Sequence, residues 1–119
     1  MAENYFYKPL AERLRAALAA GLVGDVLFVQ VNAVKHQPAT GWRGDPALAG
    51  GGALFEGGIH WLNLVANLGL TLVSATGVRP GRGAGPDRSM LVVLRYAEGA
   101  AGTLAYSWEV PSPLRGLRI

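Results

Sequence analysis

The chain has 119 residues and a mass of 12.5 kDa, so it can form one domain with a core of its own. Half of its residues are apolar and 16% are charged, which excludes an intrinsically disordered chain. It contains no cysteine, which excludes a disulfide scaffold and thiol chemistry and fits a reducing compartment without proving one.

The first third of the sequence predicts a helix and a strand. Residues 1–7 are extended in character, and Pro9 then suits the first turn of a helix. A helix is predicted over residues 9–20 with an apolar stripe that includes Leu10 and Leu14, and Gly21 is expected to end it. A strand is predicted over residues 26–34, and because both of its faces are mostly apolar we expect both to be covered.

The remainder predicts a long loop, a second helix and three strands. The loop covers residues 35–48, and loops of this length in small domains are usually functional or mobile. The helix falls within residues 50–67. The strands are predicted over residues 71–78, 89–97 and 103–110, and the last two are close enough to form an antiparallel hairpin.

This order of elements predicts an α+β fold. We expect a single domain over residues 1–119, built as a two-layer sandwich with helices on one face of a mostly antiparallel sheet. The second face of the sheet would then have no obvious cover. An uncovered apolar sheet face predicts self-association, so we expect a homo-oligomer.

The predicted helix within residues 50–67 is apolar almost all round, apart from one polar stripe. At ~100° per residue the stripe falls within an arc of roughly 60°. Its members are Glu56, His60, Asn63 and Asn67. Polar groups on a buried helix are costly unless they are partnered, so the stripe is either an internal hydrogen-bonded network or part of a binding site.

Gly57 and Gly58 favour a close approach to the backbone at this point of the helix. Each glycine costs a helix about 0.8 to 1 kcal/mol relative to alanine, so some group should need the space. That group could be another helix or a bound ligand. A metal ion is not expected, because Glu56 and His60 supply only two ligands and His36 is the other histidine of the chain.

Trp42 and Arg43 in the preceding loop form a second candidate for recognition. A large aromatic ring beside a guanidinium suits a polar, ring-shaped ligand, by stacking and forked hydrogen bonds. The alternative is a tryptophan that anchors its loop beside a solvated arginine.

Other classes of partner are not expected. The arginines are dispersed, and the closest grouping, Arg79, Arg82 and Arg88, lies in a glycine-proline loop, so we expect no nucleic-acid binding despite a net charge of +3. The sequence shows neither a signal-peptide pattern nor a run of about 18 apolar residues. We therefore expect a cytoplasmic chain with no membrane partner.

Four segments in order, AENYFYKP, a helix, GDVLFV and WRGDPALAGGGALFEGGIHWLN, give the chain a resemblance to a known family. It resembles, over essentially its whole length, the C-terminal domain of the Gfo/Idh/MocA family of NAD(P)-dependent oxidoreductases. The resemblance implies enzymes that act on sugars, inositols and related polyols by moving a hydride between a hydroxyl carbon and nicotinamide.

The resemblance also implies roles for particular residues. In the family an aspartate four residues before a histidine lies beside the nicotinamide, and these positions correspond here to Glu56 and His60. His60 is then the acid/base or substrate-orienting group, with Glu56 as its partner. Trp42, Arg43 and Asn63 are implied as substrate-side contacts. Glu56 departs from the family's aspartate by one methylene, and Asn63 stands where the family commonly has aspartate.

The family's dinucleotide-binding domain, with its catalytic lysine in an E-K-P segment, would precede this region. We therefore expect the chain to be the substrate-binding and oligomerisation half of such an enzyme, as an excised or truncated piece with no cofactor-binding residues and no turnover alone. The glycines of residues 81–85 lead into Pro86 and a strand, so they are not a dinucleotide loop.

A full-length enzyme would use NAD or NADP and a small polyol or sugar. Two alternatives stay open for the chain itself. One is a non-catalytic module that binds a sugar or polyol, and the other is a purely structural dimerisation domain.

Overall fold

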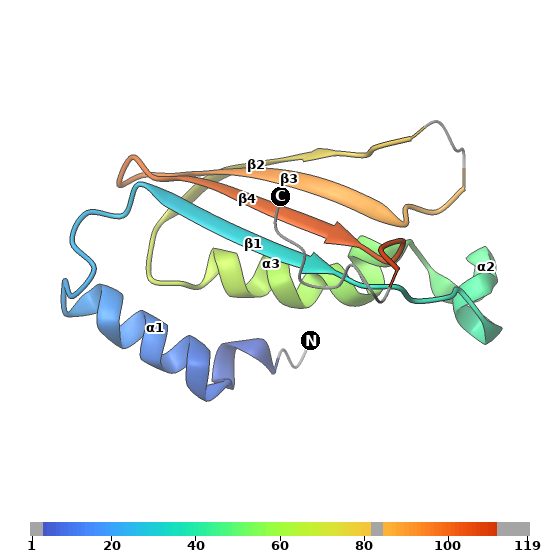
Figure 1. Cartoon of the computed structure of the whole chain (residues 1–119), viewed down its shortest axis with the longest axis horizontal. Helices are drawn as coiled ribbons and strands as arrows, with labels where there is room; N and C mark the ends of the chain where they lie inside the picture. The colour runs from blue at the N-terminus through green and yellow to red at the C-terminus, as the bar shows by residue number, and fades with distance from the viewer. Residues whose placement is uncertain (1–3, 82–84, 112–119) are drawn as a thin grey trace.

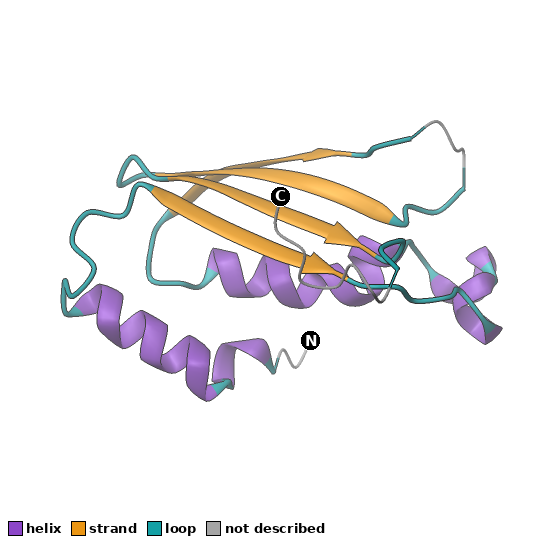
Figure 2. Ribbon diagram, viewed as in Figure 1, coloured by secondary structure: helices purple, strands orange, loops and turns teal. Residues whose placement is uncertain are grey.

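The computed structural model describes residues 4–81 and 85–111. Its helices and strands follow the predicted order, with a short helix α2 added in the long loop (Figure 2). The elements are α1 (Pro9–Ala19), β1 (Phe28–Val34), α2 (Pro46–Ala49), α3 (Ile59–Ala66), β2 (Leu72–Val78), β3 (Ser89–Tyr96) and β4 (Ala101–Ser107). Residues 1–3 of the predicted extended segment and Arg82 of the glycine-proline loop lie outside the described residues.

The four strands form one sheet in the order β1-β4-β3-β2. β1 pairs with β4 in parallel, while β2 with β3 and β3 with β4 are antiparallel. Helices α1 and α3 lie on the same side of this sheet (Figure 1). The α+β sandwich with helices on one face of a mostly antiparallel sheet is confirmed, as is the hairpin between β3 and β4.

The core lies between α3 and the sheet face that it covers. Its most buried side chains are Val65 of α3, Leu94 of β3 and Leu104 of β4. The Tyr96 hydroxyl donates a 2.9 Å hydrogen bond to the Val65 carbonyl, which fixes the end of the helix on β3. Side chains alternate between the two faces of a strand, and every second residue of β3 and β4 is buried against the helix.

The expectation that both faces of the first strand are covered is wrong. β1 is an edge strand, and the side chains of Phe28, Gln30 and Asn32 on its outer face are exposed, Phe28 by 74%. The helices cover one face of the sheet, so an apolar outer residue such as Phe28 has no layer to pack against.

Helix α1 ends at Gly21 as expected, but the first residue of its predicted apolar stripe is exposed. Gly21 has a φ of +67°, and the Leu22 N–H donates to the Ala17 carbonyl, as in a Schellman ending. The predicted apolar stripe holds only in part: Leu14 and Leu18 line a hollow with Val29 of β1, whereas Leu10 is 79% exposed and Ala11 is buried.

Helix α1 is attached to the turn before it. Residues Tyr5–Tyr7 form a 3-10 turn and not an extended segment. The Arg15 guanidinium donates a hydrogen bond to the Phe6 carbonyl and lies 4.0 Å from the centre of the Phe6 ring. These contacts join α1 to the Tyr5–Tyr7 turn.

The central helix is not one continuous α-helix. A π-helical segment, Leu54–Gly58, leads directly into α3. Asp87, just before β3, holds its start: Leu54 N–H donates to the Asp87 carboxylate at 2.8 Å, and Ala53 N–H donates to the Asp87 carbonyl at 2.7 Å. An acidic side chain here satisfies amides that the helix leaves unpaired and suits the helix dipole.

The two glycines of the π-helical segment accommodate a side chain of the sheet. A Cβ added at Gly57 would overlap the Tyr106 hydroxyl, and one at Gly58 would lie 2.6 Å from Leu54 Cδ1 and 3.4 Å from Tyr106 Cδ1. Neither a second helix nor a ligand is needed to explain the glycines, because Tyr106 of β4 occupies the space at Gly57 and the Leu54 side chain occupies the space at Gly58.

We predict that Gly57→Ala lowers the free energy of unfolding by about 1 to 3 kcal/mol, because the overlap with Tyr106 outweighs the helix propensity that alanine adds. Urea unfolding followed by circular dichroism measures the change. Gly85→Ala is the matched control, since its Cβ meets nothing within 4 Å. Tyr106→Phe should recover part of the loss in the double variant, and an unchanged or raised stability of Gly57→Ala would contradict the assignment.

Candidate functional site

Two hollows meet at the start of the central helix. The larger, of about 330 Å³, lies between the Tyr5–Tyr7 turn, the end of β1, the central helix and β4. Its lining residues are Tyr5, Ala33, Val34, Lys35, Glu56, Gly57, His60, Trp61 and Tyr106. The smaller, of about 120 Å³, is lined by Trp42, Arg43, Glu56, Asp87, Arg88 and Trp108 among others. Glu56 belongs to both hollows.

Arg43 holds the Glu56 carboxylate between the two hollows. Its Nε and Nη2 atoms donate to Glu56 Oε1 at 3.1 and 2.9 Å. The guanidinium also lies 4.3 Å from the centre of the Trp42 ring. Arg43 therefore contacts Glu56 directly, and Trp42 contacts Arg43. Of the two Glu56 oxygens, Oε1 accepts both of these hydrogen bonds.

The loop that carries Trp42 and Arg43 is folded, and not a long irregular segment. It contains a 3-10 turn over Gly41–Gly44 and then helix α2. Asp45 caps α2, because its side chain accepts a 2.9 Å hydrogen bond from the Ala47 N–H. These short elements give Arg43 a defined position opposite the central helix.

The His60 ring is positioned by the Tyr5–Tyr7 turn. It stacks on the Tyr5 ring with 5.2 Å between centroids and 12° between planes. Tyr5 in turn meets Trp61 edge to face at 5.0 Å, and Lys8 Nζ lies 3.5 Å from the centre of the Tyr5 ring. A stacked partner restricts rotation of the imidazole, so His60 faces the larger hollow in a constrained orientation.

Tyr106 brings a phenol to the same hollow. Its hydroxyl accepts a 2.8 Å hydrogen bond from Trp108 Nε1. Burial raises the pKa of Tyr106 above its ordinary value, the Trp108 hydrogen bond opposes this, and the negative charge of Glu56 adds to the rise. The hydroxyl therefore stays neutral at physiological pH and keeps a proton that it can donate.

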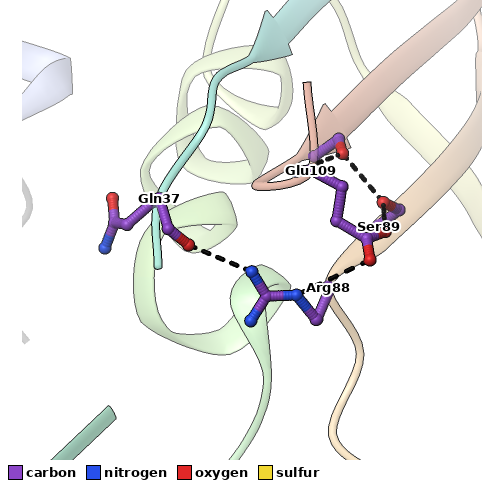
Figure 3. A network of polar contacts seen from close by, with 5 residues as sticks. Gln37, Arg88, Ser89 and Glu109 are labelled. Atoms are coloured by element: carbon purple, nitrogen blue, oxygen red, sulfur yellow. Dashed lines mark hydrogen bonds and ion pairs between the residues drawn. The ribbon is translucent and has the colours of Figure 1, made fainter. Parts of the chain in front are cut away.

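A polar network supports the wall of the smaller hollow (Figure 3). Arg88 Nη2 donates to the Gln37 carbonyl at 3.1 Å, and Arg88 Nε lies 3.6 Å from Glu109 Oε1. The Ser89 hydroxyl donates to the other Glu109 oxygen at 2.7 Å. The network ties the segment after β1 to the start of β3 and to the end of β4, where the hollow lies.

The structure groups most of the predicted site residues. Glu56 and His60 line the larger hollow together, and Trp42 and Arg43 line the smaller one with Glu56. Asn63 lines neither of these hollows; its carbonyl accepts a 2.8 Å hydrogen bond from Asn67 Nδ2. Its own Oδ1 is buried with no hydrogen-bond partner in the described part of the chain.

Three lining residues were not predicted from the sequence: Tyr5, Lys35 and Tyr106. Lys35 could have been found, because it follows Val29, Val31 and Ala33 at a spacing of two and so continues the face of β1 that packs inward. Tyr5 and Tyr106 carry no such signal, since their approach to the helix depends on the tertiary fold.

Neither a metal-binding cluster nor a membrane-spanning helix occurs in residues 4–81 and 85–111. No three His, Cys, Asp or Glu side chains among them gather closely enough to hold a metal ion. No helix of this part of the chain is long and apolar enough to cross a bilayer.

The GFO/IDH/MocA C-terminal domain matches residues 11–119, and the chain belongs to this family of oxidoreductases. A comparison with curated proteins gave no match. Among solved structures, GenD2 from gentamicin A biosynthesis, in complex with NAD, is 28% identical with a TM-score of 0.76, covering 93% of this chain and 33% of its own.

Two further structures are similar in fold. Aldose-aldose oxidoreductase from Caulobacter crescentus, complexed with glycerol, has 21% identity and a TM-score of 0.77, covering 90% of this chain and 34% of its own. An inositol dehydrogenase homologue from Azotobacter vinelandii, complexed with NAD+, has 24% identity and a TM-score of 0.73, covering 90% and 31%. The chain thus spans about a third of the length of these relatives.

The family implies a dinucleotide cofactor, and the described residues do not fit its pyrophosphate. Such a group binds where a glycine-rich turn leads from a strand to free amides at a helix start. Here the amides of Ala53 and Leu54 are bonded to Asp87, and α2 begins with a proline after the Asp45 cap.

Burial also raises the pKa of Tyr96, so two tyrosines keep their protons in the folded state above the ordinary value of 10.0. Their contribution to stability is fully present below that value and is lost as the pH rises through the raised folded values. We predict that the free energy of unfolding in urea falls as the pH rises above the ordinary value of 10.0 and through the raised folded values.

Tyr96→Phe and Tyr106→Phe should each remove part of this alkaline loss, and the double variant most of it. Each also deletes a buried hydrogen bond, so the comparison uses the slope of stability against pH and not its absolute value. A double variant with the slope of the unmodified chain would show that other groups cause the loss.

Proposed function

We propose that the chain is the substrate-binding and oligomerisation domain of an NAD(P)-dependent dehydrogenase that acts on the CH–OH group of a small sugar or polyol. The observation that carries the proposal is the larger hollow, where Glu56, His60 and the Tyr106 hydroxyl share one wall. Membership of the family supports it, as do the relatives solved with NAD and with glycerol.

In this proposal each side chain has a defined task. An imidazole nitrogen of His60 accepts the proton of the substrate hydroxyl, or orients that hydroxyl. Glu56, whose Oε1 is held by Arg43, offers Oε2 as acceptor for a second substrate hydroxyl. Trp42 and Arg43 contact the substrate from the smaller hollow. Asn63 stays a predicted contact whose place in the fold lies apart from both hollows.

We predict that the purified chain binds a polyol such as myo-inositol in calorimetric titration, with no oxidation of NADH when its ketone counterpart is added. His60→Ala should weaken the binding by about tenfold, because it removes a hydrogen-bonding group from the hollow. His36→Ala is the matched control, since His36 is exposed and lines neither hollow.

The results of these titrations distinguish the proposed enzyme domain from its alternatives. Turnover by the chain alone would sink the claim that it lacks the full catalytic apparatus. Binding that survives His60→Ala would contradict the assignment of the hollow. No binding at all, with folding unchanged in His60→Ala, would favour a structural dimerisation domain.

The outer face of the sheet favours the oligomerisation part of the proposal. The helices lie on the other side, and the register places the outward side chains of the four strands together. The large apolar ones, each at least 40% exposed, are Phe28, Val78, Leu91 and Val93. Val78, Leu91 and Val93 are neighbours in this register, and adjacent exposed apolar side chains of this kind are typical of protein interfaces.

We predict that the chain self-associates through this face and that the double substitution Leu91→Lys and Val93→Lys makes it monomeric in sedimentation velocity. Charges on an apolar interface lose their hydration when it is buried, so association should weaken. Leu10→Lys is the control, because Leu10 is 79% exposed on α1, on the opposite side of the sheet. A monomeric unmodified chain, or a monomer produced only by Leu10→Lys, would contradict the assignment.

A further inference from the structure

Lys35 extends β1 by one residue and lies on the wall of the larger hollow. Its N–H donates to the Ser107 carbonyl at 2.8 Å, and its carbonyl accepts from the Val110 N–H at 3.3 Å, so its backbone is held in place against β4. Lys35 follows Ala33 by two residues and therefore faces the same side of the sheet as the central helix. It comes from the sheet, whereas Glu56 and His60 come from the helix.

The charges around the hollow do not balance. Glu56 is the carboxylate among its lining residues, and the Arg43 guanidinium already neutralises it. The described residues give the Lys35 ammonium no carboxylate partner within 4.0 Å. The nearby Glu109 and Asp87 are engaged elsewhere, with Arg88 and with the start of the helix. Lys35 is therefore a charged lining residue of the hollow without a carboxylate counterion among the described residues.

We infer that Lys35 is a specificity-determining residue and that the substrate carries a carboxylate. The inference rests on the proposed function and narrows its substrate class from neutral sugars to sugar acids of the hexuronate type. The carboxylate would pair with Lys35 at the sheet, while the hydroxyl that reacts would lie towards His60 on the helix. A charged hydrogen bond of this kind, partly shielded from water, is stronger than one between neutral groups.

A carboxylate fits the hollow better than a phosphate. A dianionic phosphate is usually met by several donors, such as an arginine cluster or the free amides of a helix start. Here the amides of Ala53 and Leu54 are bonded to Asp87, and Arg43, which lines the smaller hollow, is occupied by Glu56. A single ammonium matches the single charge of a carboxylate.

The test is calorimetric titration of the chain with three probes: D-glucuronate, D-glucose and D-glucose 6-phosphate. The first two differ only in a carboxylate in place of a hydroxymethyl group. We expect glucuronate to bind at least about tenfold more tightly than glucose, with the difference shrinking as ionic strength rises. Lys35→Gln should remove most of this preference and leave glucose binding unchanged.

Two further variants complete the design. Lys35→Arg keeps the charge and should retain most of the preference. Arg13→Gln is the charge-matched control, since it removes one positive charge from an exposed position of α1 that lines neither hollow, and it should leave all three affinities as they are.

The outcomes distinguish this inference from the proposed function. If glucose and glucuronate bind equally, or Lys35→Gln weakens both alike, the inference is overturned while the sugar-binding function stands. Tighter binding of glucose 6-phosphate than of glucuronate overturns the choice of carboxylate. If none of the three probes binds, the proposed function fails and the inference with it.

Discussion

The rest of the structure depends on one close approach, that of the Tyr106 phenol to the helix backbone at Gly57. Trp108 Nε1 donates to the phenol oxygen, so the ring cannot turn away without breaking a buried hydrogen bond. The helix accommodates the phenol by having no side chain at position 57, and the glycine at position 58 leaves space for the Leu54 side chain. Glu56 and His60 flank these glycines, and both are thereby brought over the ends of β1 and β4.

The start of the same helix is held by groups from distant parts of the chain. Asp87, 33 residues after Leu54, accepts the first amides, and Arg43, 13 residues before Glu56, holds its carboxylate. The π-helical segment lies between these attachments and the regular α3. Single-turn departures of this kind are often found at functional sites, where they re-aim one or two side chains. Here the π-helical segment contains the polar side chain of Glu56.

Elements that depend on local pattern could be predicted, and those that depend on packing could not. The period of two in β3 and β4 identifies both strands, their buried face and their hairpin, because the pairing is between neighbours in sequence. The exposure of Leu10 on α1 could not be predicted, because Leu10 belongs to the same apolar stripe as Leu14 and Leu18, which face β1. The contact of Arg15 with Phe6 could not be predicted either, because it depends on the fold of the Tyr5–Tyr7 turn.

The candidate site divides in the same way. Glu56 and His60 could be found because they are polar positions on an apolar helix. Their surroundings come from the Tyr5–Tyr7 turn, the end of β1 and β4, which meet only through the parallel pairing of β1 with β4 that places Val34 opposite Ser107. Lys35 follows directly from that register. Because Asp87 already uses the first amides of the helix, an anion in the larger hollow has no free helix start to meet there. Charge recognition in the hollow therefore falls to side chains. Because Arg43 neutralises Glu56, Lys35 is the charged lining residue left to meet an anion.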